Sequence, residues 1–158
     1  MGAGRCGLFT KTYGSSRYSF SLSSIFVGNG HGSNLKLVAS KIKEEPGFSD
    51  VVIHGNPYYV AYYRDNERID LNQRSLSKMI KKDSGYKKGT AIRLVSCSTG
   101  KEINGFAQNL ANKMGVVVKA SSDTLWVLPT GKMTIGETPM RNTGKWITYY
   151  PGGNKNEK

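Results

Sequence analysis

The stretch Val51-Val52-Ile53-His54-Gly55 decides the fold of this chain, because a wholly apolar run stops abruptly at a histidine and a glycine. Such a run is typical of a parallel strand that is covered on both faces. Another strand is predicted over 91–95, and it leads directly into Ser96-Cys97-Ser98-Thr99-Gly100. The two segments therefore predict neighbouring strands whose ends carry chemically active side chains.

Helical and strand patterns surround these two segments. The first helix is predicted to begin at Ser33 and to end at Pro46-Gly47, with apolar residues recurring at helical spacing. A second helix follows the N-cap residue Asn72, and a third has its clearest periodicity from Ile103 to Met114. The remaining predicted elements are a strand over 18–27, a hairpin of 58–63 and 68–71, and strands over 116–118 and 125–128.

The alternation of strands and helices predicts an α/β fold with a mostly parallel sheet and right-handed crossovers. Helices are expected on both faces, which would give three layers, and the C-terminal end from residue 131 to 150 is expected to be rich in β-structure. We expect one domain over 18–151, between a flexible N-terminal segment (1–17) and a tail (152–158).

Composition limits the classes of function. The 158 residues carry a formal net charge of +12, which raises nucleic acid, polyphosphate or an acidic protein as partners. No stretch approaches the 18 apolar residues of a membrane span. Two cysteines are too few for a disulfide framework, and no zinc spacing, P-loop or dinucleotide fingerprint occurs, so no metal or cofactor is predicted.

Three predicted loops should meet at one edge of the sheet. In parallel sheets, sites form beyond the carboxyl ends of the strands, and the loops 28–32, 54–57 and 96–100 would lie there. They contain His31, His54 and Cys97. Both histidines of the chain and one of its cysteines are thus predicted to gather at this edge.

This placement favours acyl-transfer chemistry. We expect a nearby helix N-terminus to lower the pKa of the Cys97 thiol, and the His54 imidazole to exchange a proton with the thiol or the leaving group. The N–H of Gly55 and that of Cys97 could stabilise a developing oxyanion. Taken singly, however, a cysteine at a strand end is more often a small buried hydrophobe, and a histidine after a strand a turn residue.

The segments Asp50-Val51-Val52-Ile53-His54-Gly55 and Ile92-Arg93-Leu94-Val95-Ser96-Cys97 resemble the catalytic segments of the caspase-like (clan CD) cysteine peptidases. The nearest similarity is to the self-processing cysteine protease domains of large bacterial toxins. The stretch from Ile92 through Phe106-Ala107-Gln108 to Trp126-Val127 also resembles C-terminal toxin modules of polymorphic and contact-dependent inhibition systems.

The resemblance covers about residues 25–150 and implies a peptidase-like toxin. In that reading Cys97 is the nucleophile, His54 is the general acid/base, and the N–H groups of Gly55 and Cys97 form the oxyanion hole. The toxin would be delivered as the C-terminal part of a larger bacterial protein and would act on a protein or another acyl substrate in the target-cell cytoplasm. Its producer would need an immunity protein, which we expect to be acidic and to cover the three loops.

The same resemblance assigns the substrate pocket to two further segments. Their candidate residues are Asn29, His31, Ser122 and Asp123. Asp123 could select a basic side chain, but a turn-forming role is at least as common for aspartate in such a sequence. For His31, a solvated loop position is the more common role.

A basic region offers a different reading of the chain. Residues 74–101 contain Arg74, Lys78, Lys81, Lys82, Lys87, Lys88, Arg93 and Lys101, against the single acidic residue Asp83. Clusters of this kind attract phosphate, and the tyrosines of 58–63 could stack on bases. A nucleic-acid-targeting toxin in which Cys97 only packs is therefore the alternative, and a solvated helix face is the simplest explanation of the charge.

Overall fold

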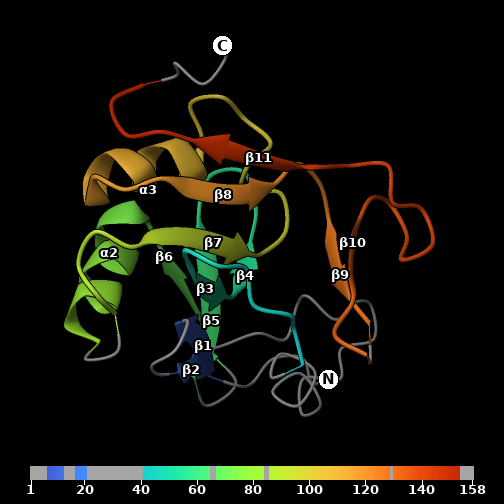
Figure 1. Ribbon diagram of the computed structural model, residues 1–158, viewed down its shortest axis with the longest axis horizontal. Helices are drawn as coiled ribbons and strands as arrows, with labels where there is room; N and C mark the ends of the chain where they lie inside the picture. The colour runs from blue at the N-terminus through green and yellow to red at the C-terminus, as the bar shows by residue number, and fades with distance from the viewer. Residues whose placement is uncertain are drawn as a thin grey trace.

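The computed structural model describes residues 7–12, 17–20, 41–64, 67–83, 86–128 and 130–153 of the chain (Figure 1). The strands are β1 (Gly7–Thr12), β2 (Arg17–Phe20), β3 (Phe48–Val52), β4 (His54–Gly55), β5 (Val60–Arg64), β6 (Glu67–Leu71), β7 (Ala91–Val95), β8 (Val118–Ser121), β9 (Leu125–Val127), β10 (Met133–Ile135) and β11 (Trp146–Tyr149). The helices are α2 (Gln73–Lys82) and α3 (Phe106–Met114).

The main sheet is mixed rather than mostly parallel. Its strand order is β11-β8-β7-β3-β1-β2. The central strands β3, β7 and β8 are parallel, as predicted, whereas β1, β2 and β11 join them antiparallel. The mostly parallel prediction is wrong at the edges, because β11 returns to the sheet through the β9–β10 hairpin and not through a crossover helix.

The two faces of the main sheet are covered differently. On one face α2 and α3 pack together over a core that includes Val51, Leu94 and Phe106. On the other face Val52 and Val95 pack against the β9–β10 hairpin. Both described helices thus lie on the same face of the sheet. We predicted helices on both faces, but in the described ranges a hairpin covers the second face.

The helix boundaries follow local sequence signals with one exception. Asn72 caps α2 by accepting a hydrogen bond from the N–H of Ser75 at 2.8 Å, and Gly115 ends α3 with a left-handed φ of 71°, both as predicted. However, α3 begins at Phe106, and Ile103, predicted to lie on its inner face, is 66% exposed. The preceding residues form turns, and the N–H of Phe106 binds the carbonyl oxygen of Pro57 at 2.8 Å.

The first predicted helix does not extend through residues 41–45, which are irregular. Polar contacts hold this segment on the sheet instead. Arg93 forms two hydrogen bonds with the carboxylate of Asp50, at 2.7 and 2.8 Å, and also contacts Glu45 and the carbonyl oxygen of Lys43. These contacts satisfy a charge that is almost fully buried, so they outweigh the helical pattern. The remainder of that helix, residues 33–40, lies outside the described residues.

Two further predictions concern the N-terminal part of the chain and the hairpin. The strand predicted over 18–27 overlaps β2, and residues 21–27 lie outside the described ranges. Gly7–Thr12, within the segment that we expected to be flexible, forms β1 and pairs with β3. The predicted hairpin is confirmed as β5 and β6. With β4 these two strands form a separate three-stranded sheet.

Candidate active site

His54 and Gly55 lie at the junction between the two sheets. The N–H of Ile53 still donates to the carbonyl oxygen of Val95, at 3.2 Å, which holds the chain against β7. The next two residues form β4 and pair with β5, His54 opposite Ala61. The chain therefore passes directly from core strand β3 into the first strand of the small sheet. The position of His54 is fixed by the contact of Ile53 with β7 and by the pairing of β4 with β5.

Cys97 lies just beyond the end of β7 and is half-buried. Its sulfur contacts the backbone of the first residue of β9: Leu125 donates its N–H to Sγ at 3.4 Å, and Sγ lies 3.7 Å from the Leu125 carbonyl oxygen. The next residue, Ser98, has a left-handed φ of 55°, the single positive φ among the described non-glycine residues. A serine rarely adopts this conformation, which is often found at functional sites.

The loop that carries Cys97 is anchored on both sides. The hydroxyl groups of Ser96 and Thr99 share a hydrogen bond at 2.8 Å, and the carbonyl oxygen of Ser96 accepts the Ser121 hydroxyl at 2.6 Å. The N–H of Ser98 donates to the carbonyl oxygen of Asp123 at 3.0 Å. Cys97 thus lies in a turn that follows β7 and is held by hydrogen bonds to the end of β8.

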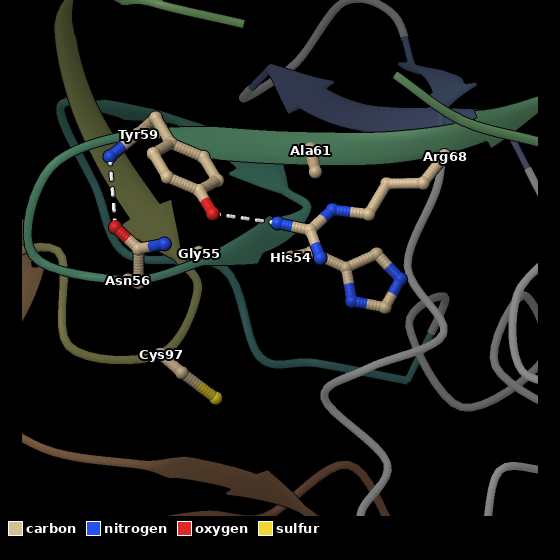
Figure 2. A pocket seen from close by; sticks show the side chains of 7 residues that line it. All are labelled: His54, Gly55, Asn56, Tyr59, Ala61, Arg68 and Cys97. Atoms are coloured by element: carbon tan, nitrogen blue, oxygen red, sulfur yellow. Dashed lines mark hydrogen bonds between the residues drawn. The ribbon is translucent and has the colours of Figure 1, made fainter. Parts of the chain in front are cut away.

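The structure brings His54, Gly55 and Cys97 together around one pocket of about 340 Å³ (Figure 2). The other residues that line this pocket are Asn56, Tyr59, Ala61 and Arg68. His54 belongs to the small sheet and Cys97 to the loop after β7 of the main sheet, so their shared pocket agrees with the edge that the sequence predicted. Their roles in this pocket stay predictions.

The electrostatic state of this pair differs from the expected one. Burial raises the pKa of the Cys97 thiol to about 11; a hydrogen bond from the Leu125 backbone opposes the rise, and the charge of Asp123 adds to it. The expected lowering by a helix N-terminus is wrong, because α3 begins only at Phe106. Burial, together with the positive charge of Arg68, lowers the pKa of His54 to about 4. Near neutral pH both groups are therefore uncharged.

The N–H groups of Gly55 and Cys97, which we predicted to form an oxyanion hole, belong to residues that line the pocket. Asn56 donates its N–H to the carbonyl oxygen of Tyr59, so the adjoining Gly55–Val60 pair is a non-hydrogen-bonded one and the N–H of Gly55 points away from β5. The N–H of Cys97 has no hydrogen-bond acceptor among the described residues. Both groups retain the capacity to bind an oxygen atom.

The predicted substrate-binding residues are placed only in part. Asn29 and His31 lie outside the described residues. Ser122 accepts the N–H of Lys145 through its hydroxyl, and the carboxylate of Asp123 accepts the N–H of Thr124 at 2.7 Å. The Asp123 bond is local, as in a turn, whereas the Ser122 bond joins the end of β8 to the residue before β11. Neither residue lines the described pocket.

Sequence reasoning missed the pocket residues that the hairpin supplies. Arg68 donates to the Tyr59 hydroxyl at 2.7 Å and to Asp70 at 2.9 Å, and its guanidinium group lies over the Tyr59 ring. In strands, alternate residues share a face, and directly paired residues lie side by side. His54 pairs with Ala61, and Ala61 pairs with Asp70, so these three residues lie on one face of the small sheet. Tyr59 and Arg68, two positions along from Ala61 and Asp70, lie on the same face. The alternation itself was readable in the sequence.

The basic region is largely exposed, with one correction. The side chains of Arg74, Lys78, Lys81, Lys82, Lys87, Lys88 and Lys101 are exposed. Arg93 is not part of this surface, because it is 6% exposed and ion-paired with Asp50. The exposed lysines agree equally with a solvated face and with a surface that attracts anions.

Fold and pocket together define an α/β domain with a mixed sheet and a cysteine–histidine pocket at the carboxyl edge of its parallel strands. The chain belongs to the family described as "Domain of unknown function (DUF8616)", whose model matches residues 23–135. That range includes every residue that lines the pocket. No curated protein and no solved structure matches the sequence. None of the described helices has the length and apolar character needed to cross a membrane.

Proposed function

We propose that this domain is a hydrolase of acyl compounds that uses a Cys97–His54 pair, and that it acts as a peptidase-like bacterial toxin. One observation carries the proposal: Cys97 and His54 line the same pocket, although the loop after β7 supplies the cysteine and strand β4 of the other sheet supplies the histidine. Gly55 and Cys97 add N–H groups beside them, and Ser98 adds a rare backbone conformation directly after the cysteine. A purely packing cysteine would need none of these neighbours.

The uncharged state of both groups determines how the reaction would begin. A thiol with a raised pKa is a poor nucleophile until a base removes its proton, and a neutral imidazole is such a base. We therefore infer that proton transfer from Cys97 to His54 accompanies attack. The sulfur forms a bond to the carbonyl carbon of the substrate while the thiol proton passes to the imidazole.

The remaining steps follow from the same groups. The carbonyl oxygen becomes negatively charged, and the N–H groups of Gly55 and Cys97 would stabilise it. The protonated His54 then donates its proton to the leaving amine or alcohol as the bond to the acyl carbon breaks. A water molecule, deprotonated by His54, releases the acyl group from sulfur as a carboxylic acid and restores the thiol.

The proposed function is tested by expressing the wild type, Cys97→Ala and His54→Gln in a bacterium and scoring growth together with the integrity of proteins and RNA. We expect both substitutions to abolish toxicity. Cys6→Ala is the matched control, because it removes the other cysteine of the chain. Circular dichroism and thermal unfolding of the purified variants establish that they are folded. A folded Cys97→Ala variant that stays fully toxic would overturn the proposal.

The net charge of +12 supports a second part of the proposal, an acidic immunity protein that covers the loops 54–57 and 96–100 together with 28–32. An acidic partner would associate through long-range attraction, which salt weakens. Mixing the domain with an acidic protein encoded beside it should yield a salt-sensitive complex that blocks alkylation of Cys97. Failure to bind at any salt concentration would contradict this part alone.

The alternative function is a toxin that targets nucleic acid. The exposed lysines of α2 and of the segment after it support this alternative. That function predicts salt-sensitive binding to RNA or DNA. Joint replacement of Lys81, Lys82, Lys87 and Lys88 by Gln should then abolish toxicity, and Cys97→Ala should not. The hydrolase predicts the opposite pattern, so the same growth assay separates the two functions.

A further inference from the structure

Arg68 introduces a positive charge into a pocket that contains no other charged group among the described residues. Besides Arg68, the pocket is lined by His54, Gly55, Asn56, Tyr59, Ala61 and Cys97, none of which is acidic. Asp70 binds the guanidinium group at Nε, but both side chains of this ion pair are about half exposed, at 48% and 54%. Ion pairs so exposed contribute little free energy, so Asp70 holds the arginine in place without preventing it from binding another anion.

The hydrogen bonds around Arg68 leave donors available to a ligand. Arg68 uses Nε for Asp70 and Nη2 for the Tyr59 hydroxyl, whereas Nη1 has no described acceptor. Tyr59 accepts this bond with its oxygen and so keeps a hydroxyl proton to donate. Asn56 accepts two backbone N–H groups with Oδ1, at 2.7 and 3.0 Å, which leaves its amide Nδ2 as a donor. In Figure 2 hydrogen bonds link Asn56 to Tyr59 and Tyr59 to Arg68.

We propose that Arg68, with Tyr59 and Asn56, forms a carboxylate-binding subsite beside Cys97, so that the preferred acyl compound carries a carboxylate close to its scissile carbonyl. The position of the carboxylate relative to a cleaved bond rests on the proposed hydrolase function. The anion-binding site itself rests on the geometry of the pocket. A planar guanidinium group held by neighbouring bonds is well suited to bind a carboxylate. The subsite also differs from the expectation that Asp123 selects a basic side chain.

The proximity of Arg68 to His54 supports this assignment from a second direction. The charge of Arg68 contributes to the lowered pKa of His54, so the positive field of the guanidinium group extends to the catalytic side of the pocket. An anionic group bound to Arg68 would offset that field. Binding of the preferred substrate would therefore make His54 a stronger base when the thiol proton must be removed.

The subsite is tested first by two alkylating reagents of similar size that differ in charge, iodoacetate and iodoacetamide. The rates of Cys97 alkylation are measured by mass spectrometry on the whole chain, and their ratio is compared with the ratio for glutathione. The ratio cancels any change in thiol pKa, because both reagents attack the same thiolate. We expect wild type to favour iodoacetate relative to glutathione, and Arg68→Gln to lower the ratio about tenfold.

Two variants control for charge and for folding. Arg68→Lys keeps the charge and should retain most of the preference. Arg141→Gln removes an exposed arginine that contacts Glu137 and does not line the pocket, and it should leave the ratio unchanged. Equal ratios in wild type and Arg68→Gln would overturn the inference. This outcome is independent of hydrolysis, so it is distinguishable from failure of the proposed function.

A second experiment distinguishes where the carboxylate comes from. Peptidyl p-nitroanilides with Asp or Glu before the cleaved bond are compared with their Asn and Gln counterparts, and peptides with free C-termini with amidated ones. A preference for Asp or Glu that Arg68→Gln abolishes assigns the carboxylate to a side chain, whereas one for free C-termini assigns it to the peptide end. Equal hydrolysis of all pairs by wild type overturns the inference. No hydrolysis of any of them counts against the proposed function, while the alkylation ratio still decides the subsite.

Discussion

Thr99 packs so closely against Gly55 that a Cβ atom on Gly55 would lie 2.7 Å from the Cγ2 atom of Thr99. The same Cβ would lie 3.1 Å from the carbonyl oxygen of Cys97. A side chain at position 55 would therefore push the cysteine loop away from the histidine. We expect Gly55→Ala to lower the free energy of unfolding by about 1–3 kcal/mol and to reduce the proposed activity. Urea unfolding followed by circular dichroism measures the first effect.

Thr99→Ser provides the matched rescue. It removes Cγ2 but keeps the hydroxyl group that shares a hydrogen bond with Ser96. The double variant Gly55→Ala/Thr99→Ser should recover part of the stability that Gly55→Ala loses, and Thr99→Ser alone should have a smaller effect. Strictly additive effects of the two substitutions would show that the contact between positions 55 and 99 is not the cause.

The raised pKa of the Cys97 thiol predicts an unusual pH dependence of alkylation. Because the pKa is about 11, the thiolate fraction of the folded protein should rise tenfold per pH unit up to about pH 10. A free thiol of ordinary pKa levels off near pH 9. The rate of iodoacetamide labelling of Cys97 between pH 7 and pH 10 checks this. A plateau below pH 8 would instead show an activated thiolate.

The lowered pKa of His54 links protonation to stability. The folded protein binds this proton with a pKa of about 4, whereas the ordinary value in an unfolded chain is 6.5. Between these values the unfolded chain binds more protons, so the free energy of unfolding should fall as the pH drops from 6.5 to 4, by up to about 3 kcal/mol. Above pH 6.5 this group contributes no pH dependence.

Urea unfolding at pH 7, 6 and 5 measures this effect in wild type and His54→Gln. The variant lacks the titrating group, so its stability should decline less over this range. Other groups titrate equally in both proteins, and the difference between the two therefore isolates His54. Parallel declines would contradict the burial of a neutral imidazole.

The ion pair of Arg93 and Asp50 should be essential for stability. Arg93 and Asp50 are 6% and 2% exposed, so removal of the carboxylate takes the bidentate partner from a buried charge, and Glu45, which also contacts Arg93, is partly exposed. We expect Asp50→Ala to lower the free energy of unfolding by about 3–5 kcal/mol. Glu137→Ala breaks an exposed pair with Arg141 and should change it by less than about 0.5 kcal/mol. Similar losses in both variants would contradict the predicted difference.

The parts of the fold that sequence patterns predicted are those that local chemistry determines. Asn72 and Gly115 mark helix ends because their cap geometries need few distant partners. The parallel strands β3 and β7 were predicted because each ends in apolar residues, Val51-Val52 and Leu94-Val95, shortly before a turn. Helix periodicity failed at Ile103 and over 41–45, where contacts with Pro57 and Arg93 determine the backbone. Contacts of that kind join residues distant in the chain, and no local pattern encodes them.

In the candidate site, too, sequence patterns predicted some features, and contacts between distant residues determined the others. His54, Gly55 and Cys97 were found because strand order alone brings the ends of two neighbouring strands together. Arg68 was missed because its position in the pocket depends on the pairing of β5 with β6 and on β4 joining them. The state of the thiol was also mispredicted, because burial raises its pKa and burial depends on the complete fold.

The buried pair of Asp50 and Arg93 has a consequence for the geometry of the pocket. Asp50 lies directly opposite Arg93 in the parallel ladder, 43 residues away along the chain, and the same separation relates His54 to Cys97. A slip of β3 by two residues would keep every apolar side chain on its own face, so the hydrophobic core alone does not exclude it. It would, however, displace the histidine from the cysteine by about 7 Å and leave the guanidinium group opposite an apolar side chain. One electrostatic contact in the interior thereby excludes a misaligned sheet in which His54 and Cys97 could not share their pocket.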